Sequence, residues 1–82
     1  MVDHHQYAKT ARTFGLILNL VQDNHYGREL VLENVREAMA EFRKENSIFN
    51  PKLFAATVAQ TAFPHDETRH PQLIVELLNE KP

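Results

Sequence analysis

Five glutamates recur at every fourth position along one segment of this 82-residue chain. They are Glu29, Glu33, Glu37, Glu41 and Glu45, here called the acidic ridge. Residues four apart are neighbours on a helix surface, where like charges repel by about 0.2–0.5 kcal/mol per pair. Arg36 and Lys44 lie three residues from Glu33 and Glu41 and can offset part of this repulsion. We predict that Glu33, Glu37, Glu41 and Glu45 bind a basic partner; the alternative is a solvated, charge-balanced face.

The five histidines raise the question of a metal site. His4 and His5 are adjacent and would point about 100° apart on a helix. His65, Asp66 and His70 could together hold a transition metal. However, no pair of histidines has the i, i+4 spacing that zinc sites on helices use. We therefore interpret both groups as solvated polar segments and expect no metal and no other cofactor.

The sequence also lacks the local patterns of common catalytic sites. It contains no glycine-rich phosphate loop, no nucleophile elbow and no cysteine, and Ser47 is its only serine. Glutamates on an exposed ridge lack the dry pocket that general acid catalysis needs. We expect no catalytic residues and no enzymatic activity.

Four helices must position these groups. Apolar residues recur at three- and four-residue spacing over residues 4–23, 28–45, 51–62 and 71–79, and no segment alternates like a strand. The pattern places Phe42, Leu53 and Phe54 inward, and the alanines of the third helix allow a neighbour to approach closely. We predict an all-α, four-helix bundle-like fold with short connections, formed by residues 1–82 as a single domain.

The turn between the second and third helices carries the most specific local signal. Pro51 disfavours helical geometry at Asn50, which makes Asn50 the expected N-cap and Pro51 the first helical residue. Phe49 and Phe54 then flank the cap as a hydrophobic staple. The direction of the third helix is therefore expected to be set locally.

The first helix has an unusually wide apolar surface in its second half. Leu16, Ile17 and Leu20 extend the apolar arc to about 200° of the circumference, against the ~100° stripe typical of a surface helix. We expect this helix either to be central in the bundle or to form a homodimer. The residues assigned to that core or dimer seam are Phe14, Ile17, Leu18 and Val21.

A helix–turn–helix pair also raises DNA binding. The recognition helix would be residues 51–62, but its only charged residue is Lys52, and Thr57, Gln60 and Thr61 are its remaining polar groups. Helices that read base edges are richer in Arg, Lys, Asn and Gln. The net charge of −2 likewise argues against a general nucleic-acid surface.

Residues 42–54 resemble the helix, Asn, Phe, helix, Phe element of small uncharacterised proteins of bacteriophages and mobile elements. The matching positions are Phe42, Phe49 and Phe54, and the segment covers under half of the chain. The resemblance implies a small protein that binds a host or phage macromolecule, for example as an inhibitor of a defence or transcription complex. It transfers no functional residue.

Composition sets the remaining expectations. The absence of cysteine fits a reducing compartment, and the apolar runs, such as Leu16 to Leu18, are too short for a signal or membrane segment. We expect a soluble, cytoplasmic protein–protein interaction module whose acidic helix docks on a basic surface of a nucleic-acid-handling complex. A homodimer is compatible with this expectation. The alternative is a small dimeric DNA-binding transcriptional regulator.

Overall fold

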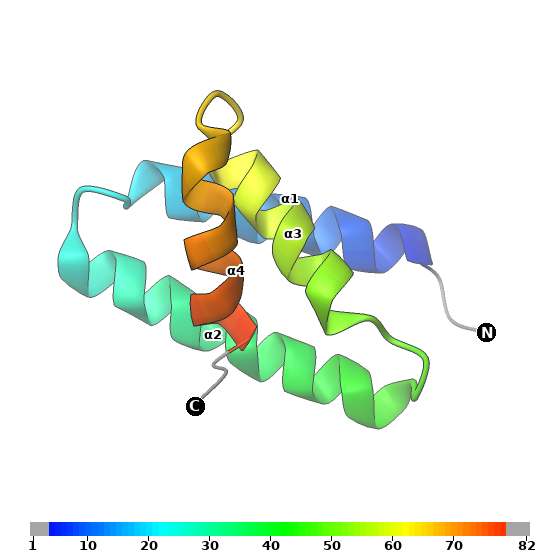
Figure 1. Ribbon diagram of the computed structural model, residues 1–82. Coiled ribbons are helices and arrows are strands. Elements are labelled where there is room, and N and C mark those ends of the chain that lie inside the picture. Colours follow the sequence, from blue (N-terminus) through cyan, green and yellow to red (C-terminus); the bar gives the residue numbers. More distant parts are fainter. Residues whose placement is uncertain (1–3, 79–82) are drawn as a thin grey trace.

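Four α-helices and one 3₁₀ turn make up the described part of the chain. The computed structural model describes the backbone of residues 4–78 and the side chains of residues 6–78, and no strand occurs there. The elements are α1 (His4–Leu20), α2 (His25–Glu45), α3 (Pro51–Ala62), η1 (Glu67–Arg69) and α4 (His70–Leu78). In Figure 1, α1 and α2 run in roughly opposite directions, α3 lies between them, and α4 crosses α2 steeply. The predicted all-α fold with short connections is confirmed.

The start of α3 has the predicted cap. Asn50 accepts a hydrogen bond through its side-chain oxygen from the backbone N–H of Leu53 at 3.1 Å, and Pro51 occupies the first turn. The rings of Phe49 and Phe54 pack with their centroids 5.7 Å apart. The N-cap, the N-terminal proline and the hydrophobic staple are all present.

The connection between α1 and α2 lies three residues earlier in the chain than predicted. We predicted that the first helix ends at residue 23 and the second begins at residue 28, whereas α1 ends at Leu20 and α2 begins at His25. Asn24 explains the early start, because its side chain accepts a hydrogen bond from the N–H of Gly27 at 3.0 Å. A capped first turn accommodates Gly27, which the predicted helix bounds leave in the connection.

The C-terminal part of the described chain also differs from the prediction. The η1 turn precedes α4, and α4 begins at His70 rather than at residue 71. The carbonyl of Asp66 accepts from the N–H of Arg69 at 3.3 Å, which closes η1. The predicted end at residue 79 lies outside the described residues.

The core draws on all four helices. Its largest fully buried side chains are Leu18, Leu32, Val35, Val58, Leu73 and Leu77. Burying one such side chain contributes about 1.5–3 kcal/mol.

Two inward assignments need correction. Leu53 is 65% exposed, because it sits in the first turn of α3 beside the cap and points away from the core. Phe42 is only half-buried, at the edge of the aromatic cluster that it forms with Tyr7, Phe49 and Phe54.

The alanines Ala55, Ala56 and Ala59 were predicted to let another helix approach α3 closely. Ala55 and Ala59 are fully buried, whereas Ala56 is only half-buried. The close approach occurs with α1, where a Cβ added to Gly15 would lie 2.5 Å from the Cβ of Thr61. At the end of this contact the side-chain amide of Asn19 donates to the carbonyl of Ala62 at 2.7 Å. That bond satisfies a carbonyl that the end of α3 leaves without an intrahelical donor.

Two arginines on α2 hold α4 in place. Arg36 donates two hydrogen bonds to the backbone carbonyl of Glu76, at 3.0 Å from Nε and 2.7 Å from a terminal nitrogen. Arg28 forms an ion pair with the Glu76 carboxylate at 2.8 Å. The carbonyl belongs to the last turn of α4, where it has no intrahelical donor and where the helix dipole favours a cation.

Removing the Arg36 guanidinium should therefore loosen α4. We expect Arg36→Met to lower the free energy of unfolding by about 1.5–3 kcal/mol, the range for hydrogen bonds from charged groups. Arg43→Met removes an exposed arginine from the same helix and should change the stability by under about 0.5 kcal/mol. Urea denaturation followed by circular dichroism compares the two variants. Equal losses would contradict a specific role of Arg36.

Candidate protein-binding surface

The acidic ridge lies on the solvent side of α2. All five of its glutamates are exposed, while Val31, Leu32, Val35 and Met39 on the opposite side of the helix are buried. This separation of an exposed acidic side from a buried apolar side follows directly from the 3.6-residue period of the helix. The predicted partner-binding residues Glu33, Glu37, Glu41 and Glu45 therefore share one helix, and all four remain accessible.

The ridge is less neutralised than the sequence suggested. We expected Arg36 to offset Glu33, but its guanidinium turns to α4 instead. Lys44 comes within 4.0 Å of Glu41, and because both side chains are largely exposed this contact contributes little. Within the described residues, no ion pair involves Glu33, Glu37 or Glu45. The middle of the ridge therefore carries uncompensated negative charge.

The predicted seam on α1 belongs mostly to the core. Leu18 is fully buried, and Phe14 and Val21 are half-buried against the core, whereas Ile17 is 40% exposed. The residues that widen the apolar arc remain uncovered: Leu16 is 60% and Leu20 is 82% exposed. Because α1 has no helix of its own chain over that side, a central position does not account for the whole arc.

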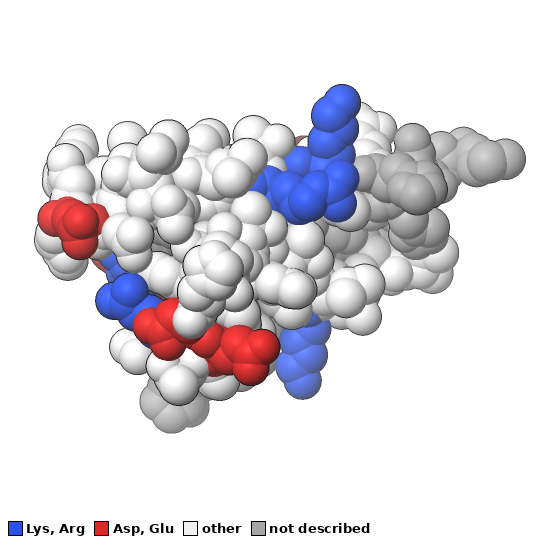
Figure 2. All heavy atoms as spheres, turned by 90° about the horizontal axis from the view of Figure 1, so that it is seen from above, with Lys and Arg blue, Asp and Glu red and all other residues white. Residues whose placement is uncertain are grey.

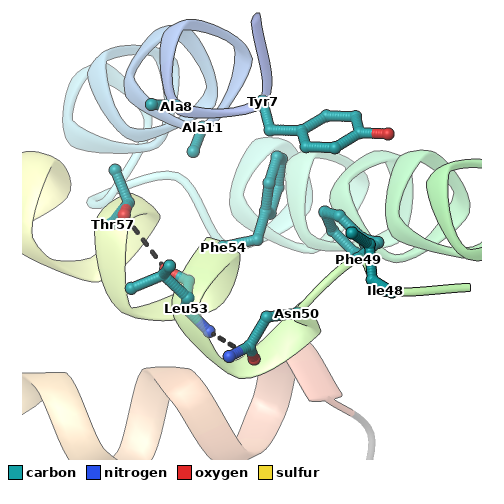
Figure 3. A pocket seen from close by; sticks show the side chains of 9 residues that line it. All are labelled: Tyr7, Ala8, Ala11, Ile48, Phe49, Asn50, Leu53, Phe54 and Thr57. Atoms are coloured by element: carbon teal, nitrogen blue, oxygen red, sulfur yellow. Dashed lines mark hydrogen bonds between the residues drawn. The ribbon is translucent and has the colours of Figure 1, made fainter. Parts of the chain in front are cut away.

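An apolar groove that the sequence did not predict lies between α1, α3 and the turn that joins α2 to α3. It encloses about 230 Å³. Figure 3 shows its lining, formed by Tyr7, Ala8, Ala11, Ile48, Phe49, Asn50, Leu53, Phe54 and Thr57. Ile48 and Leu53 are 71% and 65% exposed at this groove. Ile48 was the sequence feature that could have indicated this groove. It is an apolar residue directly before the staple residue Phe49, and the staple does not require its side chain to reach the core.

The polar residues of α3 do not form a separate polar face. Thr57 and Thr61 donate their hydroxyl hydrogens to carbonyls of their own helix, those of Leu53 and Thr57, at 3.0 and 2.9 Å. Lys52 and Gln60 are exposed. Two exposed polar side chains give α3 little with which to read base edges.

The histidine segment before α4 is held together by its own contacts. Asp66 accepts a hydrogen bond from the hydroxyl of Thr68 and lies 3.8 Å from Arg69. The Nε2 of His70 donates to the carbonyl of Phe63 at 2.7 Å, so that nitrogen is engaged. No group of three potential ligands comes together within the described residues. His4 and His5 are described by their backbone alone.

The face over α1 and the connection before α4 has few charges. Figure 2 looks down on it and shows a mostly uncharged surface with a few small charged groups, in one of which basic and acidic side chains adjoin. Among the described residues no helix is long and apolar enough to cross a membrane.

Comparisons with known protein families, curated proteins and solved structures were made. No protein-family model, curated protein or solved structure matches the chain. The resemblance of residues 42–54 to phage and mobile-element proteins stays a prediction.

Proposed function

We propose that this protein is a small protein–protein interaction module that binds a basic protein surface through Glu33, Glu37, Glu41 and Glu45. The observation that carries the proposal is the accessible, uncompensated ridge on α2, from which Arg36 is withdrawn to hold α4. The groove and the histidine segment offer no comparable concentration of charge.

An energetic argument supports a functional ridge. Each pair of glutamates four residues apart costs a few tenths of a kcal/mol of helix stability. Alternating Glu with Lys along the same face would remove this cost and would keep the helix soluble. A basic partner would turn the repulsion into attraction on binding. Basic surfaces are typical of nucleic-acid-handling complexes, so an inhibitor of such a complex, as the phage resemblance implies, fits the proposal.

The test removes the charge and keeps the shape. Replacing Glu33, Glu37 and Glu41 by Gln should leave the melting temperature unchanged or raise it, because side-chain repulsion is relieved. Capture of partners from a lysate of the source organism should fall strongly. Capture by the unmodified protein should weaken between about 10 and about 150 mM ionic strength, over which the Debye length falls from about 30 to about 8 Å.

The matched control carries the same change in net charge elsewhere. Asp23→Asn, Asp66→Asn and Glu67→Gln neutralise three exposed carboxylates outside the acidic ridge. This variant should retain capture. If the ridge variant folds and captures as well as the control variant, the proposal is wrong. A mobility-shift assay with the unmodified protein provides a further check, because tight DNA binding at physiological salt would favour a DNA-binding regulator instead.

A further inference from the structure

The apolar groove beside the capped turn is open because α1 has small side chains there. Next to Tyr7, the α1 residues that line it are Ala8 and Ala11. One turn further along α1, at Gly15, the two helices touch, since an added Cβ would lie 2.5 Å from the Cβ of Thr61. Beside Ala8 and Ala11 the same pair of helices leaves about 230 Å³ that methyl groups do not fill.

The lining of the groove is apolar both where it is buried and where it is exposed (Figure 3). Phe49 and Phe54 are buried, and their ring centroids lie 5.7 Å apart, so this part of the lining is a preformed aromatic surface. Ile48 and Leu53 are largely exposed. A ligand with an apolar group would therefore cover surface that the free protein leaves in water.

The segments that border the groove carry basic residues and no acidic ones. Neither α1 (His4–Leu20) nor α3 (Pro51–Ala62) nor the turn of residues 46–50 contains Asp or Glu. Arg12 is exposed, and within the described residues its guanidinium forms no ion pair. Because Arg12 follows Ala8 by four residues, the two share one side of α1, with their Cβ atoms about 5–6 Å apart. The long side chain of Arg12 can therefore bring its guanidinium to the groove.

We propose that the groove binds a small carboxylic acid with an apolar chain, with the chain in the groove and the carboxylate on Arg12. A guanidinium can hold a carboxylate through two parallel N–H···O bonds, and no acidic side chain of the bordering segments competes for Arg12 or repels the ligand. The volume of about 230 Å³ lies below the ~300–1,000 Å³ of pockets for drug-sized molecules. The acid must therefore be small, such as a short-chain fatty acid.

This site is separate from the proposed function. Arg12 and the residues that line the groove lie outside the acidic ridge, so the two surfaces can be changed independently. The apolar lining alone would accept a neutral ligand as well. Arg12 is what favours an acid, and this difference can be measured.

Titration of the full chain with octanoate, followed by NMR, tests the proposal. The methyl signals of Ala8, Ile48 and Leu53 should shift and saturate, with a Kd of about 1 mM or lower. Octanamide has the same chain without the charge and is the matched probe. It should shift the same signals but bind about tenfold more weakly, because the charge-assisted bond to Arg12 is lost.

Two pairs of variants separate the groove from general effects. Ala8→Leu fills the groove and should abolish the binding of both probes, whereas Ala40→Leu, at an exposed position on α2, should bind both as the unmodified protein does. Arg12→Gln should weaken octanoate binding about tenfold and leave octanamide binding unchanged. Arg43→Gln removes an exposed arginine outside the groove and should change neither. Circular dichroism establishes that each variant is folded.

Three results would overturn the proposal. The first is the absence of saturable shifts with octanoate, and the second is unchanged binding by a folded Ala8→Leu variant. The third is an equal affinity of Arg12→Gln and the unmodified protein for octanoate, which would remove the carboxylate from the ligand class. None of these results bears on capture through the acidic ridge, so the two proposals stand or fail separately.

Discussion

Replacing Phe54 by alanine is expected to lower the free energy of unfolding by about 3–5 kcal/mol, the range for truncating a buried phenylalanine. Phe54 is only 4% exposed, and its ring packs 5.6 and 5.7 Å, between centroids, from Phe42 and Phe49. Its loss would leave a cavity beneath the start of α3 and would remove one half of the staple. Domains have a total stability of about 5–15 kcal/mol, so the change removes a large share of it, and at the low end of that range much of the protein would be unfolded at room temperature.

Thermal denaturation, with urea denaturation for the free energy, measures this effect. Leu53→Ala is the matched control, because Leu53 is the preceding residue of the same helix and is 65% exposed. It should cost under about 1 kcal/mol. Phe42→Ala should fall between the two, since Phe42 is only half-buried. A loss below about 1 kcal/mol for Phe54→Ala would mean that the α3 face has been assigned wrongly.

The parts of the fold that the sequence predicted depend on neighbours in the chain. Asn50, Pro51 and the two staple phenylalanines all lie within the six residues 49–54, and every local preference there favours the same geometry. The start of α2 was misplaced for an equally local reason. Gly27 suggests a loop, but Asn24 three residues earlier supplies the cap that allows helix to begin before the glycine.

The parts that the sequence did not predict depend on contacts between distant residues. Arg36 was paired with Glu33 because the two share a helix, yet its actual acceptor, the carbonyl of Glu76, is forty residues away. A backbone carbonyl has no signature in the sequence, and only the approach of α4 to α2 creates this site. The groove beside Ile48 and Leu53 arises in the same way, from three segments that meet only in the folded chain.

The candidate protein-binding surface also has features that the sequence predicts and features that depend on tertiary contacts. The exposure of the acidic ridge follows from periodicity alone, and the structure agrees with it. The uncompensated charge of the ridge does not follow from periodicity, because it depends on which acceptor the Arg36 guanidinium binds. The exposure of Leu16 and Leu20 likewise depends on which sides of α1 the other helices cover, and the residues themselves do not determine that.

Gly15→Ala is the second change for which we expect a large effect, and its sign is opposite to the usual one. In a helix, alanine is favoured over glycine by about 1 kcal/mol. At Gly15, however, an added Cβ would lie 2.5 Å from the Cβ of Thr61 and 2.8 Å from the carbonyl oxygen of Val58. These atoms belong to α3 at its closest approach to α1, and neither is the end of a flexible side chain. Relief requires the two helices to separate.

We therefore expect Gly15→Ala to destabilise the protein by about 1–3 kcal/mol, the usual cost of overpacking, in spite of the gain in helix propensity. Gly27→Ala is the matched control. Its Cβ would lie 3.3 Å from the Cβ of Val21, at the end of α1, where a shift of a few tenths of an ångström suffices. That variant should be close to neutral or more stable, because the propensity gain is opposed only weakly. Urea denaturation of both variants gives the difference directly. If Gly15→Ala proved at least as stable as Gly27→Ala, α1 and α3 could not approach as closely as described, and the alanines of α3 would need another explanation.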